Sequence, residues 1–166
     1  MHGREFAIYF GDRKAPFLEI LSGAGGGRGE PCLGSESLLL AVVVGAVASY
    51  AIAFIWYAVL FKNQWMRLTG VTEMKPSLKV VVLALIGSWF TSWVLDHAII
   101  FGNAYLHTSG VSGGLMCGFF NWLGFFAPVT MMGVLYEKRS WRLWALDNGF
   151  WLLTLLAMGM ILSSWT

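Results

Sequence analysis

Residues 38–61 read LLLAVVVGAVASYAIAFIWYAVLF and contain no charged side chain. About 20 apolar residues in a helix, each rising 1.5 Å, cross the roughly 30 Å hydrocarbon core of a bilayer. A buried helix of a soluble domain has no need of so long an uncharged run. We therefore predict that residues 38–61 form a membrane-spanning helix.

Three further apolar segments follow, at residues 80–101, 111–136 and 143–165. Their only charged residues are Asp96 and Asp147, and none of them shows the alternation typical of a transmembrane β-strand. The expected fold is therefore all-α, an integral membrane four-helix bundle over residues 37–166. The lipid bilayer is its first expected partner.

The composition excludes several classes of protein. Hydrophobic residues make up 57% of the 166-residue chain and charged residues 12%, whereas a soluble domain carries roughly 25% charged residues. A soluble domain, a disordered chain and a nucleic-acid-binding protein are therefore disfavoured. The two cysteines form no C-x-x-C motif and no Cys/His cluster, so we expect no metal and no cofactor.

Basic residues predict the orientation, because Lys and Arg near the ends of spans stay on the cytoplasmic side. Loops 62–79 and 137–142 hold seven of them: Lys62, Arg67, Lys75, Lys79, Lys138, Arg139 and Arg142. The loop at 102–110 has none. We expect both basic loops to be cytoplasmic and both termini to face outward, periplasmic if the membrane is a bacterial inner membrane.

Residues 1–36 differ from the rest of the chain. They mix acidic and basic residues and contain the glycine-rich run GAGGGRG at 23–29, which is typical of a flexible linker. No basic segment followed by an apolar one marks a cleavable signal peptide. We expect a disordered tail, or a start of translation further along the chain.

Small residues recur at every fourth position in two spans and predict close helix packing. The stripes are Ala41, Gly45, Ser49 and Ala53 in the first span, and Gly110, Gly114 and Gly118 in the third. The packing is expected within one bundle, or between copies of the chain. Pro128 should disturb the third span, because proline removes a backbone donor.

The most polar residue of the second span is Asp96, which shares a helix face with Ser88 and Ser92. At 1.5 Å per residue it lies about 24 Å along the span, close to the outer surface. With His97 beside it, Asp96 could bind a metal or relay a proton, but a solvated helix end is the simpler expectation.

Asp147 and Asn148 begin the fourth span near the cytoplasmic side. Asp147 can pair with Arg139 or Arg142, and an acid near a helix N-terminus is stabilised by the helix dipole. In the third span Asn121 lies near the midplane and needs a hydrogen-bond partner. It is expected to join helices, or to contact a ligand.

Tryptophans lie well inside the spans rather than at their ends. They are Trp89, Trp93, Trp122 and Trp151. They are expected to form a bulky aromatic core. Alternatively, with Asn121, they line a pocket for a lipid, a quinone, a pigment or a cationic ligand, since aromatic faces attract cations.

Several short motifs lie along the spans and loops. The first is Trp56-Tyr57 with Phe61, then Trp65-Met66 and Gly70-Val71-Thr72. Others are Tyr136-Glu137-Lys138-Arg139, Asp147-Asn148-Gly149-Phe150 and Gly159-Met160-Ile161-Leu162. With these motifs the chain resembles a bacterial membrane-protein family, domain-of-unknown-function family 1761, over about residues 38–165. Residues 1–36 fall outside the resemblance. The family implies four transmembrane helices and supplies no activity.

The sequence contains no cluster of reactive side chains that would suggest an enzyme. The favoured hypothesis is a structural or accessory subunit of a membrane complex, or a homo-oligomer, with membrane-protein partners or itself. The alternatives are a small-solute or proton-coupled transporter and a lipid-, quinone- or pigment-binding protein. A transporter needs an embedded carboxylate, and Asp96 and Asp147 are expected near opposite surfaces.

Overall fold

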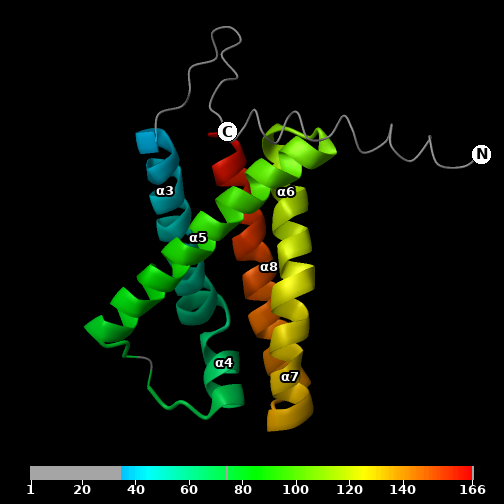
Figure 1. Ribbon diagram of the computed structural model, residues 1–166. Helices are drawn as coiled ribbons and strands as arrows, with labels where there is room; N and C mark the ends of the chain where they lie inside the picture. The colour runs from blue at the N-terminus through cyan, green and yellow to red at the C-terminus, as the bar shows by residue number, and fades with distance from the viewer. Residues whose placement is uncertain (1–34, 74, 166) are drawn as a thin grey trace, which may run out of the picture. The chain divides into compact units, whose positions relative to one another are not determined.

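A computed structural model describes residues 35–73 and 75–165, which form helices and no strand (Figure 1). The helices are α3 (Ser35–Phe54), α4 (Lys62–Thr69), α5 (Leu78–Leu106), α6 (Gly110–Asn121), α7 (Ala127–Glu137) and α8 (Trp141–Ser163), with π-helical turns η1 (Ile55–Leu60) and η2 (Trp122–Phe126). The predicted tail lies outside these residues, except that Ser35 and Glu36 already begin α3.

Four helical spans are long and apolar enough to cross a membrane, which confirms the predicted all-α membrane fold. They are Leu39–Leu60, Leu78–Leu106, Gly110–Glu137 and Trp141–Ser163. The second span is longer than expected, since the helix continues beyond Phe101 to Leu106. Asp96 therefore lies deeper within the span than the sequence predicted.

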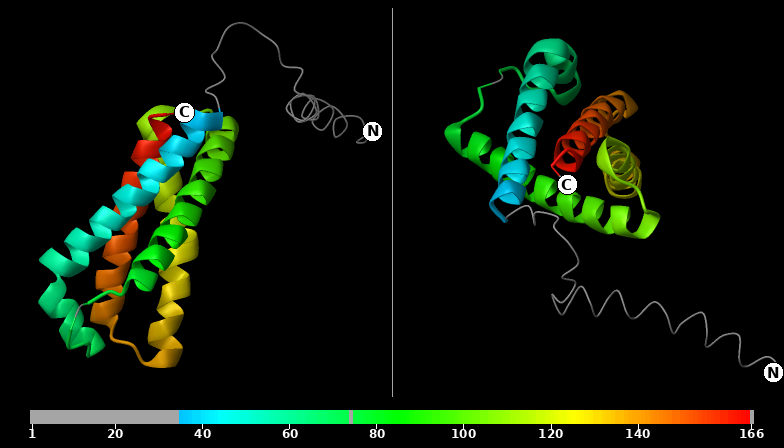
Figure 2. Two further views of the ribbon diagram at one scale, coloured as in Figure 1. Left: turned by 90° about the vertical axis from the view of Figure 1, so that its left-hand side faces the viewer. Right: turned by 90° about the horizontal axis from the view of Figure 1, so that it is seen from above.

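Helix α8 is the centre of the bundle (Figure 2). Seen from above, it lies between α3 and the span formed by α6, η2 and α7, while α5 crosses one side of the group. Leu155, Met158 and Leu162 on α8 are almost completely buried and form the core with Leu95 and Ile99 of α5. The most central helix is thus the last of the four along the chain.

Glycines allow α6 and α8 to pack backbone against backbone. A Cβ at Gly118 would lie 2.6 Å from the carbonyl oxygen of Leu155, and one at Gly114 would lie 2.7 Å from the carbonyl carbon of Gly159. Gly114 and Gly159 face each other, so neither position has room for a side chain. The stripe predicted in the third span packs within the chain, against α8.

Gly110 does not belong to that contact, so the predicted packing of this residue within the bundle is not found. A Cβ there would meet no atom within 4 Å. Its φ of +63° is instead in the left-handed region, which glycine adopts without a steric penalty. Gly110 therefore serves the turn that begins α6.

The stripe in the first span packs against α5, which crosses α3 obliquely (Figure 1). Ser49 Oγ and Ser88 Oγ are 3.3 Å apart, and a Cβ at Gly45 would lie 2.5 Å from Ser92 Oγ. The small residues of α3 thus face the polar residues of α5.

Two π-helical turns interrupt the first and third spans. In η1, the Phe61 amide donates to the carbonyl oxygen of Trp56 at 2.9 Å, five residues back. In the third span η2 ends immediately before α7, where Pro128 lies in the first turn. Because a proline has no amide proton, we expect the helix to be irregular there. The π-helical turn η2 is this irregularity.

Candidate functional site

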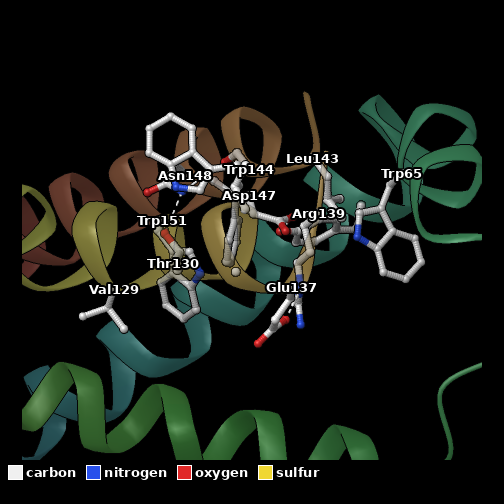
Figure 3. A pocket seen from close by; sticks show the side chains of 14 residues that line it. Trp65, Val129, Thr130, Glu137, Arg139, Leu143, Trp144, Asp147, Asn148 and Trp151 are labelled. Atoms are coloured by element: carbon white, nitrogen blue, oxygen red, sulfur yellow. Dashed lines mark hydrogen bonds and ion pairs between the residues drawn. The ribbon is translucent and has the colours of Figure 1, made fainter. Parts of the chain in front are cut away.

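A cavity of about 560 Å³ opens at the end of the bundle that carries the basic loops (Figure 3). Its lining comes from η1, α4, α7, α8 and the turn before α8, and we call it the Asp147 cavity. Its polar and aromatic lining residues are Tyr57, Trp65, Thr130, Glu137, Arg139, Trp144, Asp147, Asn148, Phe150 and Trp151.

Asp147 is held by a hydrogen bond from the first span. Tyr57 Oη donates to Asp147 Oδ1 at 2.8 Å. The tyrosine ring is itself fixed by aromatic neighbours, with centroid distances of 5.7 Å to Trp65 and 5.1 Å to Phe150. The π turn η1 places Tyr57 there, and such turns are frequent at functional sites.

Asn148, the next residue, joins the third and fourth spans. Its Nδ2 donates to Thr130 Oγ1 at 2.9 Å and to the carbonyl oxygen of Trp144 at 3.0 Å. Its own carbonyl oxygen accepts from Trp122 Nε1 at 3.1 Å. Asn148 therefore fixes the wall of the cavity that α7 and α8 share.

The predicted pairing of Asp147 with Arg139 or Arg142 is wrong for the described part of the chain. Arg139 Nε instead donates to Glu137 Oε2 at 2.7 Å. Lys138 has a φ of +58° and ends α7, and the Arg139 amide bonds back to the carbonyl oxygen of Gly133 at 3.2 Å. Arg139 thus forms its salt bridge with Glu137, and its guanidinium acts on Asp147 only from a greater distance, across the cavity that both residues line.

The electrostatics of the cavity follow from this arrangement. Glu137 and Arg139 neutralise each other at its exposed rim, where both side chains are 60% accessible. No salt bridge among the described residues reaches Asp147. The cavity therefore holds a carboxyl group that forms no salt bridge, with the Arg139 guanidinium acting on it from further away, beside five aromatic side chains, those of Tyr57, Trp65, Trp144, Phe150 and Trp151.

Trp56 lies beside the cavity and packs on α8. A Cβ at Gly149 would lie 3.3 Å from Cζ2 of the Trp56 ring, so the glycine makes room for the indole. The Trp56 ring also contacts Phe61, with centroids 4.6 Å apart. Phe61 precedes α4, which Gly70 ends with a left-handed φ of +75°.

The predicted tryptophan pocket is not a single site. Trp89 and Trp93 stack with centroids 6.4 Å apart, but Trp93 is 42% exposed on the outer face of α5. Asn121 lines a separate, mostly apolar cavity of about 360 Å³, and its Nδ2 donates to the carbonyl oxygen of Cys117. Of the predicted set, only Trp151 lines the Asp147 cavity.

Asp96 is not a solvated helix end. Its side chain is 0% exposed, and α5 continues for ten residues beyond it, roughly 15 Å of helix. His97 points elsewhere, with Nδ1 2.8 Å from the carbonyl oxygen of Trp93. Within the described residues, no group of His, Cys, Asp and Glu could hold a metal ion.

Four polar or aromatic cavity residues were given no site role from the sequence: Thr130, Glu137, Trp144 and Phe150. Each has a detectable signal. Thr130 is a hydroxyl residue just beyond Pro128, Trp144 lies at the basic end of the fourth span, and Glu137 and Phe150 fall within motifs quoted above. A search for all polar residues at the basic end of the spans would have brought Thr130 and Glu137 together with Asp147.

The fold and the cavity define a polytopic helical membrane protein with an acidic, aromatic cavity at one end. The chain belongs to the family described as "Protein of unknown function (DUF1761)", whose model matches residues 40–163. This match confirms the resemblance. No curated protein and no solved structure matches the chain.

Proposed function

We propose that the protein binds an amphipathic organic cation in the Asp147 cavity, as a binding or carrier protein rather than an enzyme. The observation that carries the proposal is the carboxyl group of Asp147, which forms no salt bridge among the described residues and lies among aromatic side chains. A cation beside an aromatic ring gains roughly 0.5–2 kcal/mol, and more when it also approaches a carboxylate.

The volume and position of the cavity support this ligand class. A cavity of about 560 Å³ falls within the usual range of roughly 300–1,000 Å³ for small-molecule sites. Trp65 lies in the short helix α4 and Trp144 in the first turn of α8, and tryptophans beside the ends of spans are typical of the place where a bilayer meets water. A ligand with a cationic head and an apolar body would reach Asp147 from that interface.

The test compares two organic ions of the same shape and opposite charge, tetraphenylphosphonium and tetraphenylborate. Binding to the purified protein in detergent is measured by isothermal titration calorimetry. We expect saturable binding of the phosphonium and none of the borate. Asp147→Asn keeps the shape of the side chain and should weaken phosphonium binding at least tenfold, about 1.4 kcal/mol.

Asp96→Asn is the matched control, because it removes the other aspartate of the spans at a site remote from the cavity in sequence and contacts. It should bind the phosphonium as the wild type does. Equal affinity of wild type and Asp147→Asn would refute the proposal, and so would equal binding of the two ions.

Self-association is the second candidate function, and one observation favours it. Gly87 on α5 and Gly124 in η2 are exposed, and a Cβ at either would meet no atom within 4 Å. A helix of a second copy could approach the backbone closely at these positions.

Single-cysteine variants test self-association on a background in which Cys32 and Cys117 are replaced by serine. Gly87→Cys should form a disulfide-linked dimer in membranes under mild oxidation, and a cysteine at Phe101, exposed further along α5, should not. If both positions cross-link equally, random collision explains the result and this candidate fails.

The proposed location is the inner membrane of a bacterium, with loops 62–79 and 137–142 in the cytoplasm. The basic residues of these loops support it. In this orientation the Asp147 cavity opens toward the cytoplasm.

A further inference from the structure

We propose that Asp96 is a proton-binding site within the membrane-spanning part of the protein, and that a proton occupies it in the helix packing described here. This site is independent of the Asp147 cavity.

Two contacts fix the register between these antiparallel helices. Ser49 lies opposite Ser88, and Gly45 lies opposite Ser92. One helical turn further along both helices, the same register brings Asp96 to Ala41, which is 0% exposed. Asp96 is therefore the last member of a polar stripe that faces the small residues of α3.

The Asp96 side chain is enclosed without polar partners. Asp96 and Ser92 are each 0% exposed. Among the described residues, neither carboxyl oxygen of Asp96 has a hydrogen-bond partner, and neither has Ser92 Oγ. A buried carboxylate without a partner is strongly disfavoured over the neutral acid.

No positive charge from the neighbouring helices compensates Asp96. On α3, Tyr50 lies more than two turns from Ala41. On α6, the Cys117 thiol is directed to the carbonyl oxygen of Ala98 at 3.6 Å. These two helices offer Asp96 no counter-ion.

The charged residues of α8 lie at the far end of the bundle. Arg142 is exposed in the first turn, and Asp147 is bonded to Tyr57. On α5 itself, His97 is exposed and directed to the Trp93 carbonyl, while Lys79 lies more than four turns away. Within residues 35–73 and 75–165, a bound proton is therefore the remaining way to neutralise Asp96, and ionisation requires α3 and α5 to separate.

Infrared spectroscopy of the full chain in bilayers tests this proposal. A protonated carboxyl group gives a C=O stretching band distinct from the carboxylate bands. At neutral pH we expect this band in the wild type, and we expect it to shift when aspartate is labelled with ¹³C at the carboxyl carbon. Asp96→Asn should abolish the band.

Asp12→Asn and Asp147→Asn should both retain the band, which leaves Asp96 as its source among the three aspartates of the chain. This elimination also keeps the test decisive if Asp96→Asn does not fold. Absence of the band in the wild type would overturn the proposal. Its loss when sodium replaces N-methylglucamine at constant pH would overturn it in favour of a metal cation.

Discussion

The contact between α6 and α8 predicts a strong effect of a single methyl group. In Gly114→Ala the new Cβ would lie 2.7 Å from the carbonyl carbon of Gly159, and closer still to its oxygen. Carbon atoms in ordinary contact are about 3.5–4.0 Å apart, so the two helices must move apart by roughly 1 Å. The obstacle is backbone, which cannot rotate away as a side chain can.

The magnitude follows from a matched comparison. Overpacking a tight interior costs about 1–3 kcal/mol, and a backbone obstacle places Gly114→Ala in the upper half of this range. Any Gly→Ala change within a helix also gains roughly 0.5–1 kcal/mol of helix propensity. Gly87→Ala gains the same propensity, and its Cβ meets no atom within 4 Å. The difference in the free energy of unfolding between the two variants therefore measures the steric clash alone, and we expect it to be about 2–3 kcal/mol.

The assay is equilibrium unfolding in mixed micelles of increasing SDS content, followed by circular dichroism. Gly159→Ala enters the same contact from α8, where a Cβ would lie 2.9 Å from the carbonyl carbon of Gly114. It should be destabilised to a similar degree, and the double variant by less than the sum, because one separation relieves both clashes. Stabilities of Gly114→Ala and Gly87→Ala within about 0.5 kcal/mol of each other would refute the reasoning.

Three further predictions concern the Asp147 cavity and the orientation. Tyr57→Phe removes the hydrogen bond to Asp147 and should lower the free energy of unfolding by about 1.5–3 kcal/mol, with no further loss when Asp147 is already alanine. Gly149→Val should displace the Trp56 ring and shift the wavelength of maximum tryptophan emission. An unchanged emission spectrum and an unchanged free energy of unfolding would show that the valine side chain fits beside the ring. A reporter that works only in the periplasm should be active when it is fused after Thr166. Activity of a fused reporter that works only in the cytoplasm would contradict the orientation drawn from the seven basic residues.

The sequence predicted the four spans well, because the hydrocarbon core demands uncharged segments and these are visible residue by residue. It misplaced the depth of Asp96, since Gly102 and Asn103 are typical of a helix end, and yet α5 continues through them to Leu106. If the span ended at Phe101, Asp96 would lie near water. The five further helical residues place Asp96 well within the span.

The candidate site was less accessible to sequence reasoning for a physical reason. A stripe such as Gly114 and Gly118 shows which face of a helix packs, but not which helix it meets, and Gly159 is known as its partner only in three dimensions. The Asp147 cavity likewise draws on Tyr57, Thr130 and Asp147 from three separate spans. Charge complementarity predicted a salt bridge between Arg139 and Asp147. The local turn geometry instead allows Arg139 to form a salt bridge with Glu137.

The central place of α8 has a consequence for biosynthesis. A ribosome releases α3, α5 and α6 before α8, so the first three spans enter the bilayer without the helix that fills their centre. Until α8 arrives, lipid chains must occupy the grooves beside Gly114 and Gly118, and the core face of α5 lacks its cover. Insertion of the fourth span is therefore the step that completes the tertiary structure, and a ribosome stalled before Trp141 would leave an incompletely packed protein exposed to membrane quality-control proteases.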